Sequence, residues 1–122
     1  MKLTIEKKRP SNLSATQIRE VLTDCDDVLV DKFINFHREN KDVYELFLIN
    51  SVIMQQRGYG TYSAWTIANK IRWDKDFQTK SAAEEFKINN NYIALYARLV
   101  MAKTPSLEGF FTLRATKKAS SL

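Results

Sequence analysis

The stretch KDVYELFLINSVIMQQRG, residues 41–58, carries the strongest helix signal in the chain. Its apolar residues recur at the spacing that places side chains on one face of an α-helix. They are Val43, Leu46, Phe47, Ile49, Val52 and Ile53. Gly58 stands just after the last turn, where helices commonly end on glycine. Because apolar side chains extend over much of the circumference, the stretch predicts a long helix over 41–57 that runs through the core.

Shorter helical patterns precede and follow this stretch. Ser14 can cap a helix over 15–24, because Gln17 follows it at the spacing of a capping box. A second helix over 26–40 begins with aspartates, which suit the positive end of the helix dipole. Beyond Gly58, a serine cap predicts a helix over 64–73.

The last predicted helix covers residues 91–103 and begins in an asparagine run that suits a helix cap. The polar segment 74–85 is predicted to be an exposed loop. Residues 59–62 are predicted to form a turn or a very short strand. Short strands are predicted at 85–88 and, most clearly, in the aromatic and β-branched segment 109–114. The sequence therefore predicts a mainly α fold of four to five helices with a short two- or three-stranded β element.

Size and composition favour one globular domain over residues 1–122. The chain has a mass of 14.2 kDa, with 44% hydrophobic and 27% charged residues. We expect residues 1–12 to form a flexible basic arm and residues 115–122 a frayed tail. The lone Cys25 cannot form an internal disulfide, and no apolar run reaches the roughly 20 residues that span a bilayer. We therefore expect a cytoplasmic protein without a membrane partner.

The net charge of +5 is unevenly distributed along the chain. Residues 1–19 carry +4, residues 20–45 carry −5 and residues 46–122 carry +6. Such a division would follow from a face that binds a polyanion beside an acidic back. The alternative is an ordinary solvated surface with a mild positive bias.

The order of elements over 59–114 is strand, helix, loop, helix and strand, which is the order of a winged helix. In that fold one helix enters the major groove and the strands contact phosphates, so residues 91–103 would be the recognition helix. Amides can pair with an adenine edge, and Lys and Arg with phosphates. The residues predicted to bind nucleic acid are Lys70, Arg72, Lys75, Lys80, Lys87, Asn89, Asn90, Asn91, Arg98, Lys103 and Arg114.

Two observations weigh against this interpretation. Each asparagine of the run 89–91 could be only a turn or cap residue. The two helices are also separated by about fifteen residues, whereas helix-turn-helix connections usually have three or four.

The aromatic residues suggest a second use of the same region. Trp65, Tyr92 and Tyr96 have core spacing, so we expect them to be buried. Trp73 and Phe77 lie at the edge of the polar loop and are the candidates for exposure. An exposed pair there could stack on single-stranded bases or anchor a protein partner.

Catalytic signals are weak. The segment Glu85-Phe86-Lys87 has the E-x-K spacing of a metal-dependent nuclease, but three residues match many chains by chance. His37 is the only histidine, and we expect it on a helix surface or at a helix end. Phosphate-binding and nucleophile motifs are missing from the sequence. We therefore predict a protein that is not an enzyme and has no catalytic residue, metal or cofactor.

Several short segments resemble a set of small bacteriophage and prophage proteins: Phe36-His37-Arg38-Glu39-Asn40, Tyr44-Glu45-Leu46-Phe47, Tyr62-Ser63-Ala64, Ile71-Arg72-Trp73, Phe86-Lys87-Ile88-Asn89-Asn90-Asn91-Tyr92 and Tyr96-Ala97-Arg98. The resemblance covers residues 33–114 and implies a phage setting in the host cytoplasm, without assigning a mechanism. It leaves two hypotheses, a DNA-binding protein of winged-helix type and a module that docks on a host protein or defence complex, for instance as an inhibitor.

Overall fold

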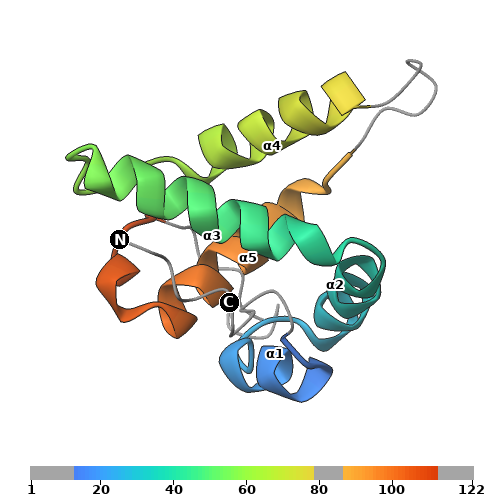
Figure 1. Cartoon of the computed structure of the whole chain (residues 1–122). Helices are drawn as coiled ribbons and strands as arrows, with labels where there is room; N and C mark the ends of the chain where they lie inside the picture. The colour runs from blue at the N-terminus through green and yellow to red at the C-terminus, as the bar shows by residue number, and fades with distance from the viewer. Residues whose placement is uncertain (1–12, 79–86, 113–122) are drawn as a thin grey trace.

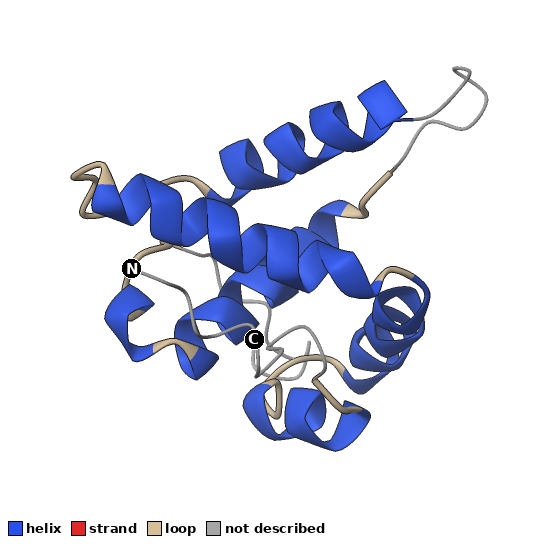
Figure 2. Cartoon of the chain, in the orientation of Figure 1, coloured by secondary structure: helices blue, strands red, loops and turns tan. Residues whose placement is uncertain are grey.

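The structure, a computed structural model, describes residues 13–78 and 87–112 (Figure 1). Within these ranges the chain forms five α-helices and one short 3-10 helix, η3. Their bounds are α1 Ala15–Val21, α2 Asp27–Glu39, α3 Lys41–Gln56, α4 Ala64–Gln78, α5 Asn90–Lys103 and η3 Pro105–Leu107. The described ranges contain no β-strand, as Figure 2 shows. The prediction of a mainly helical fold is thus confirmed, whereas the predicted β element is not seen.

Local capping explains where α1 and α2 begin. The Ser14 hydroxyl accepts a hydrogen bond from the backbone N–H of Gln17 at 3.1 Å, and the Gln17 side chain accepts one from the backbone of Ser14 at 2.9 Å. This is the predicted capping box. Asp26 caps α2 by accepting a bond from the Leu29 N–H at 3.0 Å. Because residue 26 must be extended to cap α2, α1 ends at Val21, before the predicted limit of residue 24.

The segments predicted as strands form irregular connections. Gly58 ends α3 with a φ of 107°, a conformation that glycine adopts readily. Beyond it, the backbone N–H of Tyr62 donates to the carbonyl of Phe110 at 3.0 Å and so ties the α3–α4 connection to the turn after η3. Phe110 and Phe111 are buried as parts of the core. Residues 85, 86, 113 and 114 of the other predicted strands lie outside the described ranges.

Helix α4 is longer than predicted, because residues 74–78 continue the helix instead of forming a loop. Two ion pairs stabilise this extension. Lys70 contacts Asp74 one turn further along at 2.6 Å, and Lys75 reaches Asp42 at the start of α3 at 2.5 Å. The second pair joins residues far apart in sequence, which local patterns do not reveal.

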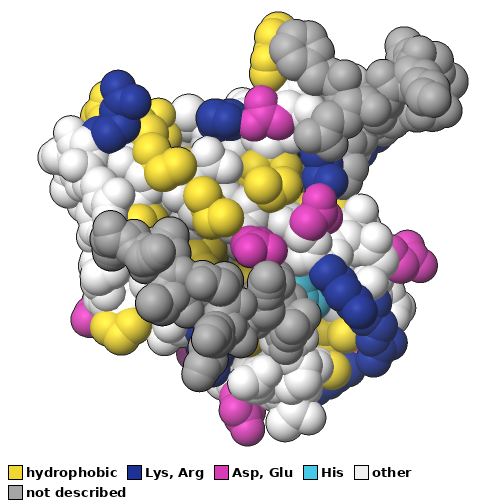
Figure 3. Space-filling view, in the orientation of Figure 1, with side chains coloured by type: hydrophobic (Ala, Val, Ile, Leu, Met, Phe, Trp, Pro, Cys, Tyr) yellow, Lys and Arg dark blue, Asp and Glu magenta, His cyan; other side chains and the backbone are white. Residues whose placement is uncertain are grey.

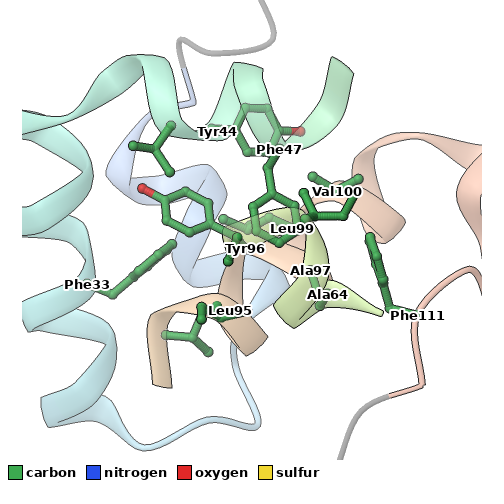
Figure 4. Packing of buried hydrophobic residues seen from close by; sticks show 14 of the residues in the cluster. Phe33, Tyr44, Phe47, Ala64, Leu95, Tyr96, Ala97, Leu99, Val100 and Phe111 are labelled. Atoms are coloured by element: carbon green, nitrogen blue, oxygen red, sulfur yellow. The ribbon is translucent and has the colours of Figure 1, made fainter. Parts of the chain in front are cut away.

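Helix α5 is the centre of the molecule, and it contacts each of the other four helices. Figure 4 shows how Tyr96, Leu99 and Val100 of α5 pack against side chains of α2 and α3 and against Phe111. The Tyr96 ring lies edge-on to Phe33, with ring centroids 4.7 Å apart. The late position of α5 in the sequence means that the first four helices pack around a segment that follows them in the chain.

A small polar group interrupts this apolar core where α2, α3 and α5 meet. His37 is 3% exposed, and its ring contacts those of Tyr44 and Tyr96, both fully buried. His37 lies in the last turn of α2, as one of the two predicted positions has it, but it is not on the surface, because the face of α2 that carries Phe33 and His37 turns toward α5.

Candidate interaction surface

The predicted recognition helix is the most buried helix of the described chain. Seven of the eight residues from 93 to 100 in α5 are at most 5% exposed: Ile93, Ala94, Leu95, Tyr96, Ala97, Leu99 and Val100. The exposed residues of α5 lie at its two ends, Asn90 and Asn91 at the start and Ala102 and Lys103 at the close. Recognition helices contact bases mainly through the residues of their first turns. Only the two ends of α5 are exposed, and its role as a recognition helix stays a prediction.

Asn89 caps α5, which agrees with the alternative interpretation of this one residue of the asparagine run. The Asn89 side chain accepts a hydrogen bond from the backbone N–H of Asn91 at 2.7 Å. Asn90 and Asn91 are exposed in the first turn. Their position follows from the need of a helix start for side-chain acceptors.

Three basic residues predicted to bind nucleic acid make contacts within the protein. Lys70 and Lys75 form the ion pairs described above. Arg72 donates to the Asn69 side chain at 2.9 Å and to the backbone carbonyl of Ile88 at 2.6 Å. Arg72 therefore fastens α4 to the segment that leads into α5.

The other basic residues are distributed over different parts of the described chain. Lys87 lies before α5 and Lys103 at its last residue, so the length of the helix, roughly 20 Å, separates them. Arg98 is half-buried and lines a cavity near the α1–α2 connection. Lys80 and Arg114 lie outside the described ranges. The hydrogen bond from Arg72 to Ile88 places Lys87 and Asn89 beside α4, whereas Lys103 lies at the other end of α5. Contact of the set with nucleic acid stays a prediction.

Exposed apolar side chains are concentrated instead on the α3–α4 hairpin, by which we mean α3, α4 and the connection over 57–63. All the large exposed apolar residues of the described chain except Val28 belong to it. They are Ile49 (45%), Ile53 (44%), Tyr59 (48%), Trp65 (42%) and Trp73 (62%). Figure 3 shows hydrophobic side chains gathered along the course of α3 on the face toward the viewer.

Helical spacing arranges these residues in rows. Ile49 and Ile53 are four residues apart and occupy one ridge of α3, which continues to Arg57. Trp65 and Trp73 are eight residues apart and occupy one ridge of α4, with the exposed Asn69 between them. Each helix thus buries one face against α5 and presents an apolar ridge outward.

The hairpin also has a distinctive charge pattern. Between Glu45 and Asp74 the sequence contains no Asp or Glu, while it contains Arg57, Lys70 and Arg72. Over residues 46–73 the hairpin is therefore apolar, with Arg57, Lys70 and Arg72 as its charged residues.

Sequence reasoning found part of this surface. Trp73 was a candidate for exposure and is exposed, but Trp65 was expected in the core and is also exposed. The Phe77 side chain is not among those described. Ile49 and Ile53 were assigned to the core because the segment is apolar around most of its circumference. A helix that is apolar around most of its circumference, but is covered on one side only, must expose apolar residues on its other side. The apolar circumference was therefore the sequence signal for the exposed ridge.

Metal and membrane sites receive no support from the described ranges. They hold no group of three or more His, Cys, Asp or Glu side chains placed to bind a metal ion. Glu85 of the E-x-K segment is outside these ranges. None of the helices in the described ranges combines the length and apolar character needed to cross a bilayer.

Comparison with protein-family models, with curated proteins and with solved structures gives no match.

Proposed function

We propose that this protein is a docking module that binds another protein through the outward surface of the α3–α4 hairpin. The observation that carries the proposal is the concentration of exposed Ile, Tyr and Trp side chains on this one supersecondary unit. Contiguous exposed apolar groups on a small protein commonly mark an interaction site. Trp and Tyr are also the residue types that contribute most to binding in protein interfaces.

The charge pattern of the hairpin indicates the chemistry of the partner. Interface centres are depleted in Asp and Glu and enriched in aromatic residues and Arg, which is the composition of residues 46–73. We infer a partner whose surface has an apolar centre bordered by carboxylates, which Arg57 can contact. A second copy of the chain fits less well, because residues 46–73 offer no carboxylate for Arg57 to contact.

Nucleic acid is the competing partner. The ridge of Trp65 and Trp73 could stack on bases, but the aliphatic Ile49 and Ile53 have no such role. Phosphate binding also needs several available cations, and on the hairpin Lys70 is paired with Asp74. The winged-helix form of this hypothesis has the further difficulty that α5 is buried. With the resemblance to phage proteins, the favoured partner is a protein of the host cell.

A displayed library of random peptides tests the proposal without knowledge of the natural partner. The full chain should enrich peptides that combine aromatic or aliphatic residues with Asp or Glu. Binding of the enriched peptides should fall at least about tenfold for Ile53→Ser and for Trp73→Ser, because each removes an exposed anchor. Val28→Ser is the matched control, since Val28 is an exposed apolar residue on α2, at 60%, away from the hairpin.

Other outcomes would overturn the proposal. Enriched peptides that bind both hairpin variants as well as the wild type would place the interaction elsewhere. A concentration-dependent dimer in sedimentation experiments, lost in Ile53→Ser, would make a second copy the occupant. Salt-dependent binding of single- or double-stranded DNA that the Trp73→Ser variant loses would assign the surface to nucleic acid.

A further inference from the structure

One row of side chains on the outward side of α3 has a charge at each end and apolar groups between them. Glu45, Ile49, Ile53 and Arg57 follow one another at intervals of four residues, so they lie along one ridge of the helix, here called the α3 row. The row is roughly 18 Å long, at about 1.5 Å per residue. Ile49 and Ile53 are 45% and 44% exposed, Arg57 is exposed and Glu45 is partly exposed. Figure 3 shows hydrophobic side chains along this part of the molecule.

The charges at the two ends of the α3 row are not neutralised within the described part of the chain. Neither Glu45 nor Arg57 takes part in an ion pair there. Lys41 stands one turn beyond Glu45, further from the isoleucines, and in the same ranges it forms no ion pair with Glu45. The apolar centre of the row is therefore bordered by a carboxylate on one side and by a guanidinium on the other.

The shape of the α3 row limits the kind of segment that can cover it. The backbone N–H and C=O groups along the side of a helix are bonded within that helix, so a partner strand would find no groups to pair with. Proline-rich segments bind in grooves lined by aromatic rings, and the row contains none. A helix does fit, because side chains at four-residue spacing pack into the groove between two such rows of a second helix.

We infer that the partner covers the α3 row with an amphipathic helix, in which an apolar pair at four-residue spacing has an acidic residue at one end and a basic residue at the other. The acidic residue would contact Arg57 and the basic residue Glu45. This inference rests on the proposed docking function and specifies the partner. Charge pairs at the edge of an interface add little affinity, but they select the partner and its alignment.

A second copy of the chain is the nearest alternative, because two α3 rows match when they run in opposite directions. Two half-exposed isoleucines on each side are a small contact, since stable interfaces bury about 800 Å² per partner. The pairing would also bring together two chains of net charge +5. A foreign protein avoids this repulsion and can extend its contact to the tryptophans of α4.

Three synthetic helices test the inference. Each contains two leucines four residues apart, and a covalent staple on the opposite face keeps the short peptide helical. The positions four residues before and after the leucine pair carry Glu and Lys in the mixed helix, two Glu in the acidic helix and two Lys in the basic helix. Binding is measured by NMR titration of the isotope-labelled full chain, from the amide signals of residues 45–57.

Charge variants of the α3 row should change which helix binds best, in whichever direction the helix lies. The wild type should prefer the mixed helix, Glu45→Lys the acidic helix and Arg57→Glu the basic helix, each by roughly threefold or more. The preferences should shrink in about 0.5 M salt, because exposed charges are screened. Lys32→Glu is the matched control, since Lys32 is exposed on α2, and it should keep the wild-type order. Ile53→Ser should weaken all three helices.

The outcomes separate this inference from the docking proposal on which it rests. The same order of affinities in all three proteins would overturn the inference, and so would helices that do not bind although library peptides bind through Ile53. Docking would then stand without a partner helix. If neither the library peptides nor the helices bind, the docking proposal fails as well. A wild-type dimer in sedimentation experiments that dissociates in Glu45→Lys would overturn the inference in favour of a second copy.

Discussion

The hydroxyl of Tyr96 lies 3.5 Å from Nδ1 of His37, and both side chains are almost completely buried. Burial raises the pKa of the Tyr96 hydroxyl, with smaller contributions from the charge of Asp42 and from Tyr92, so this group stays protonated. Burial also lowers the pKa of His37, and the positive charge of Lys41 adds to this effect. A protonated Tyr96 and a neutral His37 form a compatible donor and acceptor pair.

The first prediction concerns the dependence of stability on pH. His37 has a folded-state pKa below its ordinary value of 6.5, so the unfolded chain takes up the proton first as the pH falls. The free energy of unfolding should therefore be unaffected by His37 above pH 6.5 and should decrease below it, until the folded-state pKa is reached. The slope in that window can reach about 1.4 kcal/mol per pH unit. Denaturant titrations from pH 7.5 to pH 5 measure it.

His37→Gln is the control for this prediction, because glutamine is polar but does not titrate. Its stability should change less between pH 6.5 and pH 5 than that of the wild type. Carboxylates titrate in both proteins and cancel in the comparison. Identical pH profiles would contradict the assignment of the effect to His37.

The second prediction concerns Tyr44, which is fully buried and whose hydroxyl has no hydrogen-bond partner in the described part of the chain. Burial raises its pKa to about 12. A buried hydroxyl without a partner costs free energy, so Tyr44→Phe should raise the free energy of unfolding by about 1 kcal/mol. Tyr96→Phe should lower it, because His37 would lose its contact. A destabilised Tyr44→Phe variant would show that the hydroxyl is hydrogen-bonded.

The third prediction concerns the start of α1. Ser14 and Gln17 each satisfy a backbone N–H of the other residue, so Ser14→Ala should lower the free energy of unfolding by about 1 kcal/mol. Because the two bonds are reciprocal, the double variant with Gln17→Ala should lose less than the two single losses combined. A double-mutant cycle measured by chemical denaturation tests this, and strictly additive losses would argue that the two bonds act separately.

The fourth prediction separates two roles of Arg72. In the structure its guanidinium holds the Asn69 side chain and the Ile88 carbonyl at the same time. Arg72→Lys keeps the positive charge, but an ammonium group lacks the planar fork that reaches two acceptors. The variant should lose about 1 kcal/mol of stability and exchange amide hydrogens faster at the start of α5. Lys70→Arg, on the exposed side of α4, should change neither property. If Arg72→Lys is as stable as the wild type, the fork is dispensable.

The sequence predicted the features that depend on neighbours within one or two turns. The capping box at Ser14, the cap at Asp26 and the glycine after α3 all act over a few residues, and the structure confirms them. Helical spacing likewise identified α2, α3 and α5 with small errors at their ends.

Features that depend on distant parts of the chain were not predicted. Spacing gives the relative direction of side chains on a helix but not which direction faces the core. This is why Trp65 was expected inside and His37 outside. The extension of α4 relies partly on Asp42, which precedes Lys75 by 33 residues. The aromatic residues Phe110 and Phe111 have β propensity, but in the structure they belong to a turn. Their side chains are buried in the core, and this packing determines their conformation.

The central position of α5 constrains the time at which the protein can fold during synthesis. Helices α1 to α4 are synthesised before residues 90–103. Until α5 emerges from the ribosome, the sides of the earlier helices that pack on Tyr96 and Leu99 are not covered by it. Short helices on their own are only marginally stable in water. The nascent chain would therefore expose apolar surface until α5 emerges, and chaperones that recognise such surface should be bound throughout that interval.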